Sequence, residues 1–148
     1  MPRVKGFAHP PGSNRIVPPI DWVDPPASDP QPCYEAFVPE VDDDGNEIAG
    51  IRLPPVAAPL GTYTGWNVYR AQPDALADRD GSLIPFARTR AERMAVDDLR
   101  DSLEERYGNR AGYVAMVRTA AAELLEERLL LQEDADRYIA AAEICDRF

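Results

Sequence analysis

Apolar side chains recur at three- and four-residue steps in the C-terminal part of the chain. This spacing places them on one face of a helix, because an α-helix turns once in 3.6 residues. The apolar positions of a first helix, capped by Asn109, are Tyr113, Met116, Val117, Ala120, Ala121, Leu124 and Leu125. Those of a second helix, beginning around residues 133–134, are Ala135, Tyr138, Ile139, Ala142 and Cys145. Only residues 129–132 join the two, which predicts an antiparallel helical hairpin.

Capping signals predict two shorter helices before this hairpin. Thr89 can accept a hydrogen bond from a free amide of a helix that begins near Arg90. Ser102 and Glu105 have the spacing of a capping box, in which each side chain binds a backbone amide at the helix start. Gly108 ends that second helix, since glycine adopts the left-handed backbone conformation without strain.

The strongest β signal is a pair of apolar segments, 34–38 and 48–53, on either side of the acidic turn 42–46. Asp-Gly between two β-prone segments favours a hairpin, because glycine tolerates a positive φ and aspartate can bind nearby backbone. Pro39 confines the first strand to an edge or ends it.

The same turn suggests a calcium loop as an alternative. Glu40, Asp42, Asp44 and Gly45 fall at positions one, three, five and six of an EF-hand-like loop. Position twelve, which requires a bidentate glutamate, is occupied by Ile51. We therefore interpret the cluster as an acidic turn and predict no metal site.

Thirteen of the fifteen prolines lie in the first 59 residues. Each proline removes a backbone donor and biases the preceding residue toward extended conformations, so this part forms few regular elements. We predict a mixed α and irregular/β fold: a proline-rich arm (1–33), a β-hairpin with an aromatic loop (34–70), and a helical C-terminal segment (71–148). Together they form one incomplete domain.

The aromatic loop, residues 62–67, has the sequence Thr-Tyr-Thr-Gly-Trp-Asn. Hydroxyls, an amide and two amphipathic rings around a glycine are typical of polar binding pockets. Candidate substrate-binding residues are therefore Tyr63, Thr64, Trp66 and Asn67. A buried corner, in which backbone groups satisfy these donors, is the alternative.

The net charge of −10, from 26 acidic and 16 basic side chains, repels phosphate backbones and anionic membranes. We therefore expect neither nucleic acid nor a membrane as a partner. No apolar segment approaches the length of a membrane span, and the first residues lack a hydrophobic signal core. Cys33 and Cys145 form no metal-binding spacing. Their redox state and the cellular compartment stay open.

Candidate catalytic groups are sparse. His9 is the only histidine, and neither Ser13 nor Ser82 has the second glycine of a Gly-x-Ser-x-Gly elbow, so we do not expect a complete Ser-His-Asp triad. The chain also has no phosphate-binding loop, zinc spacing or dinucleotide fingerprint. We therefore predict no catalytic residue and no cofactor.

Five segments, residues 44–54, 56–67, 81–93, 102–108 and 122–138, resemble in order the C-terminal region of the large bacterial alpha/beta-hydrolase domain-containing proteins. The resemblance covers about residues 34–145. It implies the C-terminal part of an α/β-hydrolase fold, whose serine elbow and triad histidine would lie upstream of this region.

Two hypotheses of function follow. In the first, the chain is the C-terminal segment of an esterase-like hydrolase, catalytically incomplete by itself. It would then supply a pocket wall and pack against a missing N-terminal hydrolase portion. In the second, it is an autonomous, non-catalytic helical interaction module.

Overall fold

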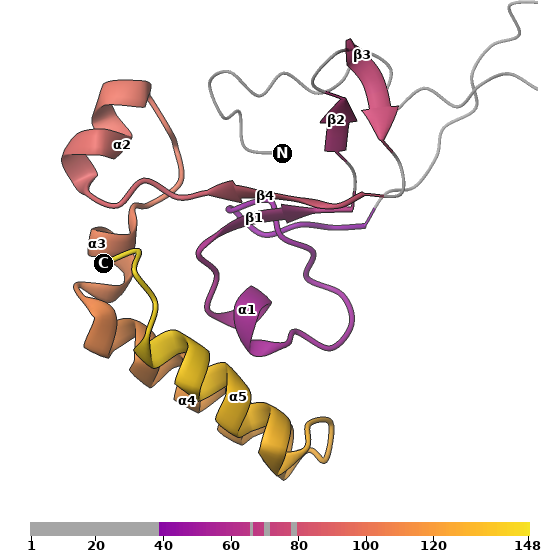
Figure 1. Ribbon diagram of the computed structural model, residues 1–148, viewed down its shortest axis with the longest axis vertical. Coiled ribbons are helices and arrows are strands. Elements are labelled where there is room, and N and C mark those ends of the chain that lie inside the picture. Colours follow the sequence, from indigo (N-terminus) through magenta and orange to yellow (C-terminus); the bar gives the residue numbers. More distant parts are fainter. Residues whose placement is uncertain (1–38, 66, 70–71, 78–79) are drawn as a thin grey trace, which may run out of the picture.

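The computed structural model describes residues 39–65, 67–69, 72–77 and 80–148 (Figure 1). The predicted arm, the predicted strand 34–38 and Trp66 lie outside these ranges. The elements in chain order are α1 (Pro54–Ala57), β1 (Gly61–Thr64), β2 (Asn67–Tyr69), β3 (Gln72–Ala77), β4 (Ser82–Pro85), α2 (Arg90–Val96), α3 (Leu103–Tyr107), α4 (Arg110–Glu126) and α5 (Gln132–Glu143).

The four strands form two nested antiparallel pairs. β1 pairs with β4 in the register Gly61 opposite Pro85 through Thr64 opposite Ser82. β2 pairs with β3 inside this outer pair, with an irregularity in the register next to Tyr69. In Figure 1 the β2–β3 pair extends from one end of the β1–β4 pair. The chain thus leaves β1 and returns through β4 beside its starting point.

Every predicted helix cap is present. The side chains of Thr89 and Asn109 accept hydrogen bonds at the starts of α2 and α4. Ser102 and Glu105 form the complete capping box of α3, and Gly108 follows that helix with a φ of 71°. These starts are local events, since each cap binds an amide three residues along the chain.

The helical hairpin is also confirmed: α4 and α5 lie side by side along most of their lengths (Figure 1). α1 packs against α4, and together these elements bury Ala58, Tyr113, Val117 and Ala142, which we call the hairpin core. Met116, predicted to lie on the buried face, is 49% exposed. The buried stripe is narrower than the apolar pattern suggests.

The structure corrects the β prediction for residues 48–53, which are not a strand. Gly50 has a φ of 83°, which interrupts an extended chain, and Arg52 binds Asp42 with a 2.7 Å Nη2–Oδ2 contact that draws the segment back toward the acidic turn. Within the described residues of the predicted hairpin, the chain forms one isolated bridge, between Val41 and Glu47.

Two further corrections concern residues 62–85. The predicted aromatic loop includes most of β1 and the first residue of β2. The segment after residue 71, predicted as helical, begins with β3 and β4 before α2 starts at Arg90. The mixed helical and antiparallel architecture is consistent with part of an α/β-hydrolase domain.

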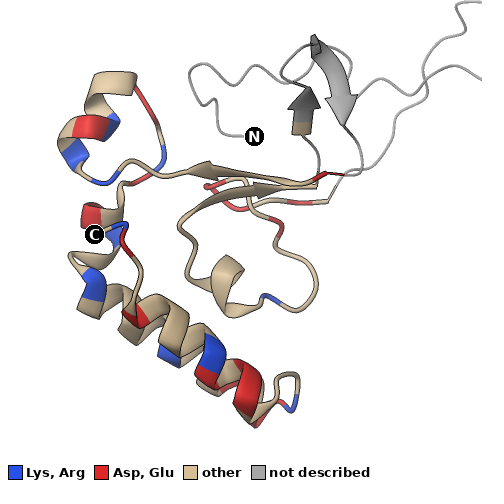
Figure 2. Cartoon of the chain, viewed as in Figure 1, with Lys and Arg blue, Asp and Glu red and all other residues tan. Residues whose placement is uncertain are grey.

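Charged residues are distributed unevenly over the helices. Figure 2 shows acidic residues concentrated where α4 ends and α5 begins. No helix in the described ranges is long and apolar enough to span a membrane.

Candidate functional site

The structure places the predicted site residues on two strands instead of one loop. Tyr63 and Thr64 belong to β1, whereas Asn67 begins β2, and Trp66 lies outside the described residues. Successive strand residues face opposite sides, so Tyr63 and Thr64 do not line the same surface. Thr64 Oγ1 lies 2.6 Å from Ser82 Oγ across the β1–β4 pair. The binding role of these residues stays a prediction.

Tyr63 is half-buried, and this burial raises the pKa of its phenol. Its backbone amide donates a hydrogen bond to the Asn46 side chain, with an N–Oδ1 distance of 2.8 Å. The Asn46 amide in turn donates to the Gly61 carbonyl, with an Nδ2–O distance of 3.2 Å. Asn46 therefore occupies the outer edge of β1 as a neighbouring strand would, at only 1% exposure.

The turn that presents Asn46 is organised by Asp42. Asp42 Oδ1 accepts hydrogen bonds from the Asp44 and Asn46 amides at 3.1 and 2.9 Å, while its Oδ2 binds Arg52. Asp44 forms an ion pair with Arg106 of α3. Arginines and backbone amides therefore bind two of the carboxylates that suggested a calcium loop, those of Asp42 and Asp44.

Arg100 is the most fully bonded side chain of the described region, at 3% exposure. Its Nε and Nη2 donate to the two carboxylate oxygens of Asp98 at 3.0 and 2.7 Å. Its Nη1 donates to Thr62 Oγ1 at 2.8 Å and to the Ile84 carbonyl at 3.0 Å, and Nη2 also reaches the Pro85 carbonyl at 3.3 Å. All five guanidinium donors are used.

We call Asp44, Asn46, Thr62, Asp98 and Arg100 the Arg100 network. Thr62 connects its two halves, since its hydroxyl accepts from Arg100 and donates to the Asp44 carbonyl. The network joins the acidic turn, the β1–β4 pair and the segment before α3.

Burial and pairing act against each other on the two carboxylates of this network. Burial alone would raise the pKa of Asp98, but the hydrogen bonds from Arg100 outweigh it and hold that pKa below its usual value. For Asp44 burial prevails over the lowering effect of Arg106, so the pKa is raised. Asp98 is therefore the more firmly ionised of the two.

The guanidinium groups of Arg100 and Arg106 both lie over the ring of Phe86. The guanidinium carbons of Arg100 and Arg106 lie 4.9 and 4.3 Å from its ring centroid, and the ring itself is buried. Cations over an aromatic face are attracted by the ring quadrupole. Because the donors of Arg100 are all used within the described part of the chain, the network fits a structural role better than a catalytic one.

Aromatic side chains close the hairpin core. Tyr107 and Tyr113 meet edge to face at 5.3 Å between centroids, and Phe148 stacks on Tyr113 at the same distance. The Tyr107 hydroxyl donates to the Pro59 carbonyl at 2.8 Å. Burial raises the pKa of Tyr107 and brings that of Tyr113 to about 12, so neither phenol is poised as a general acid or base near neutral pH.

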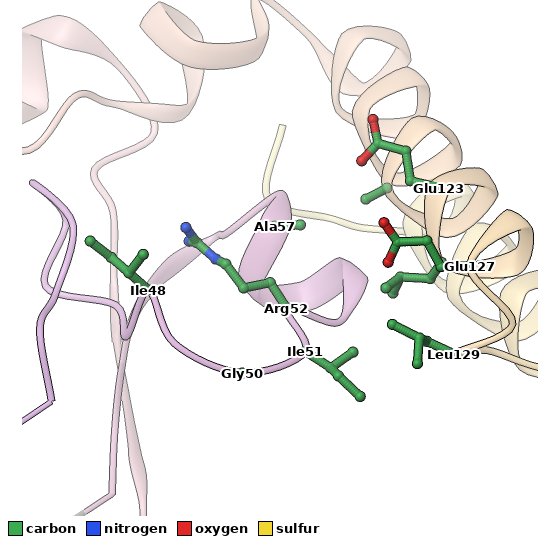
Figure 3. Close-up of a pocket in the computed structure, with 10 residues that line it drawn as sticks. Ile48, Gly50, Ile51, Arg52, Ala57, Glu123, Glu127 and Leu129 are labelled. Atoms are coloured by element: carbon green, nitrogen blue, oxygen red, sulfur yellow. The ribbon is translucent and has the colours of Figure 1, made fainter.

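An open groove of about 390 Å³ lies between the segment after the acidic turn and α4 (Figure 3). Its lining residues are Ile48, Gly50, Ile51, Arg52, Ala57, Ala120, Glu123, Leu124, Glu127 and Leu129. None of the predicted site residues lines it. The local signal that could have indicated it is the pair Glu123 and Glu127, one helical turn apart beside Leu124.

Comparison with known proteins gives one result. A family model described as alpha/beta hydrolase domain matches residues 15–140. No curated protein and no solved structure gives a significant match to the chain.

Proposed function

The chain belongs to the alpha/beta hydrolase domain family, and from this premise we propose that it acts as the C-terminal segment of an esterase-like hydrolase. In this role it is catalytically incomplete by itself. It packs its helices against an N-terminal hydrolase portion and contributes a wall to that portion's substrate pocket.

The main support for this proposal is that neither serine of the described residues has the surroundings of a catalytic nucleophile. The described ranges contain two serines, Ser82 and Ser102. Ser102 is fully buried as the cap of α3, and the Ser82 hydroxyl contacts Thr64. A hydrolase nucleophile must instead be exposed on a sharp turn and hydrogen-bonded to a base. His9, the only histidine of the sequence, lies outside the described residues.

The candidate residues for the proposed pocket wall are Tyr63, Thr64, Trp66 and Asn67. Tyr63 supports it best, because a half-buried phenol combines apolar area with a polar tip. Thr64 faces the other side of β1. Its contact with Ser82 is better suited to stabilising the pairing of β1 with β4.

An esterase assay on the purified chain tests the proposal. We expect hydrolysis of p-nitrophenyl esters at the rate of the buffer alone. Turnover well above that rate, abolished by a serine-directed inhibitor, would overturn it, because such turnover requires a nucleophile within this chain. A full-length hydrolase of the family is the positive control.

One observation favours the autonomous interaction module. The hairpin core is closed by elements of this chain alone, namely α1, α4, α5 and the C-terminal Phe148. Cooperative thermal unfolding without binding of hydrophobic dyes would support the module, whereas a partly molten chain that binds such dyes would support the dependent segment.

A further inference from the structure

The groove of Figure 3 has two walls of different character. One wall carries Ile48 and Ile51, which are 45% and 56% exposed. The other wall is α4 and its end, where Leu129 is 44% exposed and Glu123 and Glu127 extend toward the opposite side. Exposed aliphatic side chains on both walls of one concavity are typical of a surface that buries apolar groups of a partner.

The groove is also acidic. Arg52, its only basic lining residue, is paired with Asp42 outside the lining set. Neither Glu123 nor Glu127 has an ion-pair partner among the described residues. Their carboxylates lie one helical turn apart on the same face, roughly 6 Å at the backbone, which is within reach of a single cation.

We propose that this groove binds an extended peptide segment in which one arginine or lysine is flanked by aliphatic side chains. The cation lies between Glu123 and Glu127, and the flanking side chains cover Ile48, Ile51 and Leu129. This inference rests on the proposed function, because the segment is assigned to the missing hydrolase portion. An anionic segment is disfavoured by the same two carboxylates.

The probe is a fluorescently labelled synthetic peptide, Gly-Val-Leu-Arg-Ile-Val-Gly, added to the full chain and followed by anisotropy. We expect saturable binding that weakens as salt is added, since exposed charge pairs are screened. The same peptide with glutamate in place of arginine should not bind. A chain that binds neither peptide, or binds both equally, contradicts the proposal.

Variants of the chain locate the site. The double substitution Glu123→Gln and Glu127→Gln should weaken binding roughly three- to tenfold, the loss expected for two exposed ion pairs. Glu126→Gln, on the same helix but outside the groove, is the matched control and should bind as the parent does. Equal affinities of the double variant and the control would overturn the assignment. Thermal melts verify that both variants remain folded.

The apolar wall is tested in the same way. Ile51→Ser should weaken binding. Met116→Ser, at a position of α4 away from the groove and of similar exposure, should not. A homodimer in light scattering that Ile51→Ser dissociates would show that a second copy covers the groove. The chain's own N-terminal part is tested with Arg15→Ala in the absence of peptide. If this substitution changes the NMR chemical shifts of the Leu124 and Leu129 methyl groups, the N-terminal part occupies the groove. Either result overturns the proposal.

The esterase assay separates the two proposals. Absence of peptide binding together with absence of ester hydrolysis rejects the groove assignment alone. Serine-dependent turnover rejects the proposed function, whether or not the peptide binds.

Discussion

The Arg100 network and the hairpin core bury side chains by different physical means. The network joins residues up to 38 positions apart through directional hydrogen bonds, with every guanidinium donor of Arg100 in use. The hairpin core joins α1, α4 and α5 through apolar contact, which depends on area and shape more than on direction. We therefore expect the network to select one arrangement of the chain, and the core to stabilise that arrangement with less selectivity.

The largest effect is expected from Arg100→Met. The substitution leaves Asp98 buried without its partner and removes hydrogen bonds from Thr62 and two carbonyls. Breaking one side of a buried ion pair costs about 3–5 kcal/mol of unfolding free energy. Urea titration followed by circular dichroism measures the loss.

Arg110→Met is the matched control, since Arg110 is exposed at the start of α4. It should change the unfolding free energy by no more than about 0.5 kcal/mol. If both variants lose equal stability, the network does not hold the acidic turn against the strand pair, and the contrast with the hairpin core disappears.

Asn46→Ala is expected to have the next largest effect. It leaves the Gly61 carbonyl and the Tyr63 amide without their side-chain partner at the edge of β1. Unsatisfied buried groups cost about 1–3 kcal/mol each, so a total loss of at least about 2 kcal/mol in urea titration is expected. Asp43→Ala, an exposed change in the same turn, should be nearly neutral. Equal losses for the two variants would contradict a specific role for Asn46.

Val117→Ala tests the hairpin core. Val117 is almost fully buried, so removing two methyl groups should cost about 1–2 kcal/mol through lost burial and a small cavity. The neighbouring Met116→Ala, at a half-exposed position, is the control and should cost less. A larger loss for Met116→Ala would show that the exposed face of α4 is covered in solution.

The difference between the two regions also explains what could be predicted from the sequence. The caps of α2, α3 and α4 were predictable because Thr89, Ser102 and Asn109 each bind an amide three residues away. Helical periodicity predicted the hairpin-core residues of α4 and α5, but not Ala58. The network was not predictable. Apart from the local Asp98–Arg100 pair, the side chains of Asn46 and Arg100 bind partners 15 to 38 residues away, a distance at which no local pattern operates.

The strands were missed for a related reason. β1 spans only four residues, and β3 has the sequence Gln-Pro-Asp-Ala-Leu-Ala, in which proline, aspartate and alanine are all depleted in strands. The pairing of β1 with β4, and of β3 with β2, therefore overrides the low strand propensity of these segments. The groove was not predictable because its two walls come from segments more than 60 residues apart, Ile48 to Ala57 on one side and Ala120 to Leu129 on the other.

The smallest expected effect concerns pH. Hydrogen bonds from the Ser102 amide and hydroxyl, together with Arg93, lower the pKa of Glu105 from 4.5 to about 2. Because the pKa is lower in the folded chain, the ionised Glu105 carboxylate contributes to stability. This contribution is complete above pH 4.5 and is lost as the pH falls toward 2, where the folded carboxylate takes up a proton. Between pH 5 and about 2.5, the urea concentration at the unfolding midpoint should therefore fall less steeply for Glu105→Gln than for the parent chain.

Glu126→Gln is the control, because that carboxylate is exposed on α4 and lies outside the capping box. Its acid profile should follow that of the parent. Asp98, whose pKa is also lowered, contributes with the same sign, so part of the acid sensitivity should survive in Glu105→Gln. An unchanged profile in that variant would assign the acid sensitivity to the Arg100 network and not to the cap of α3.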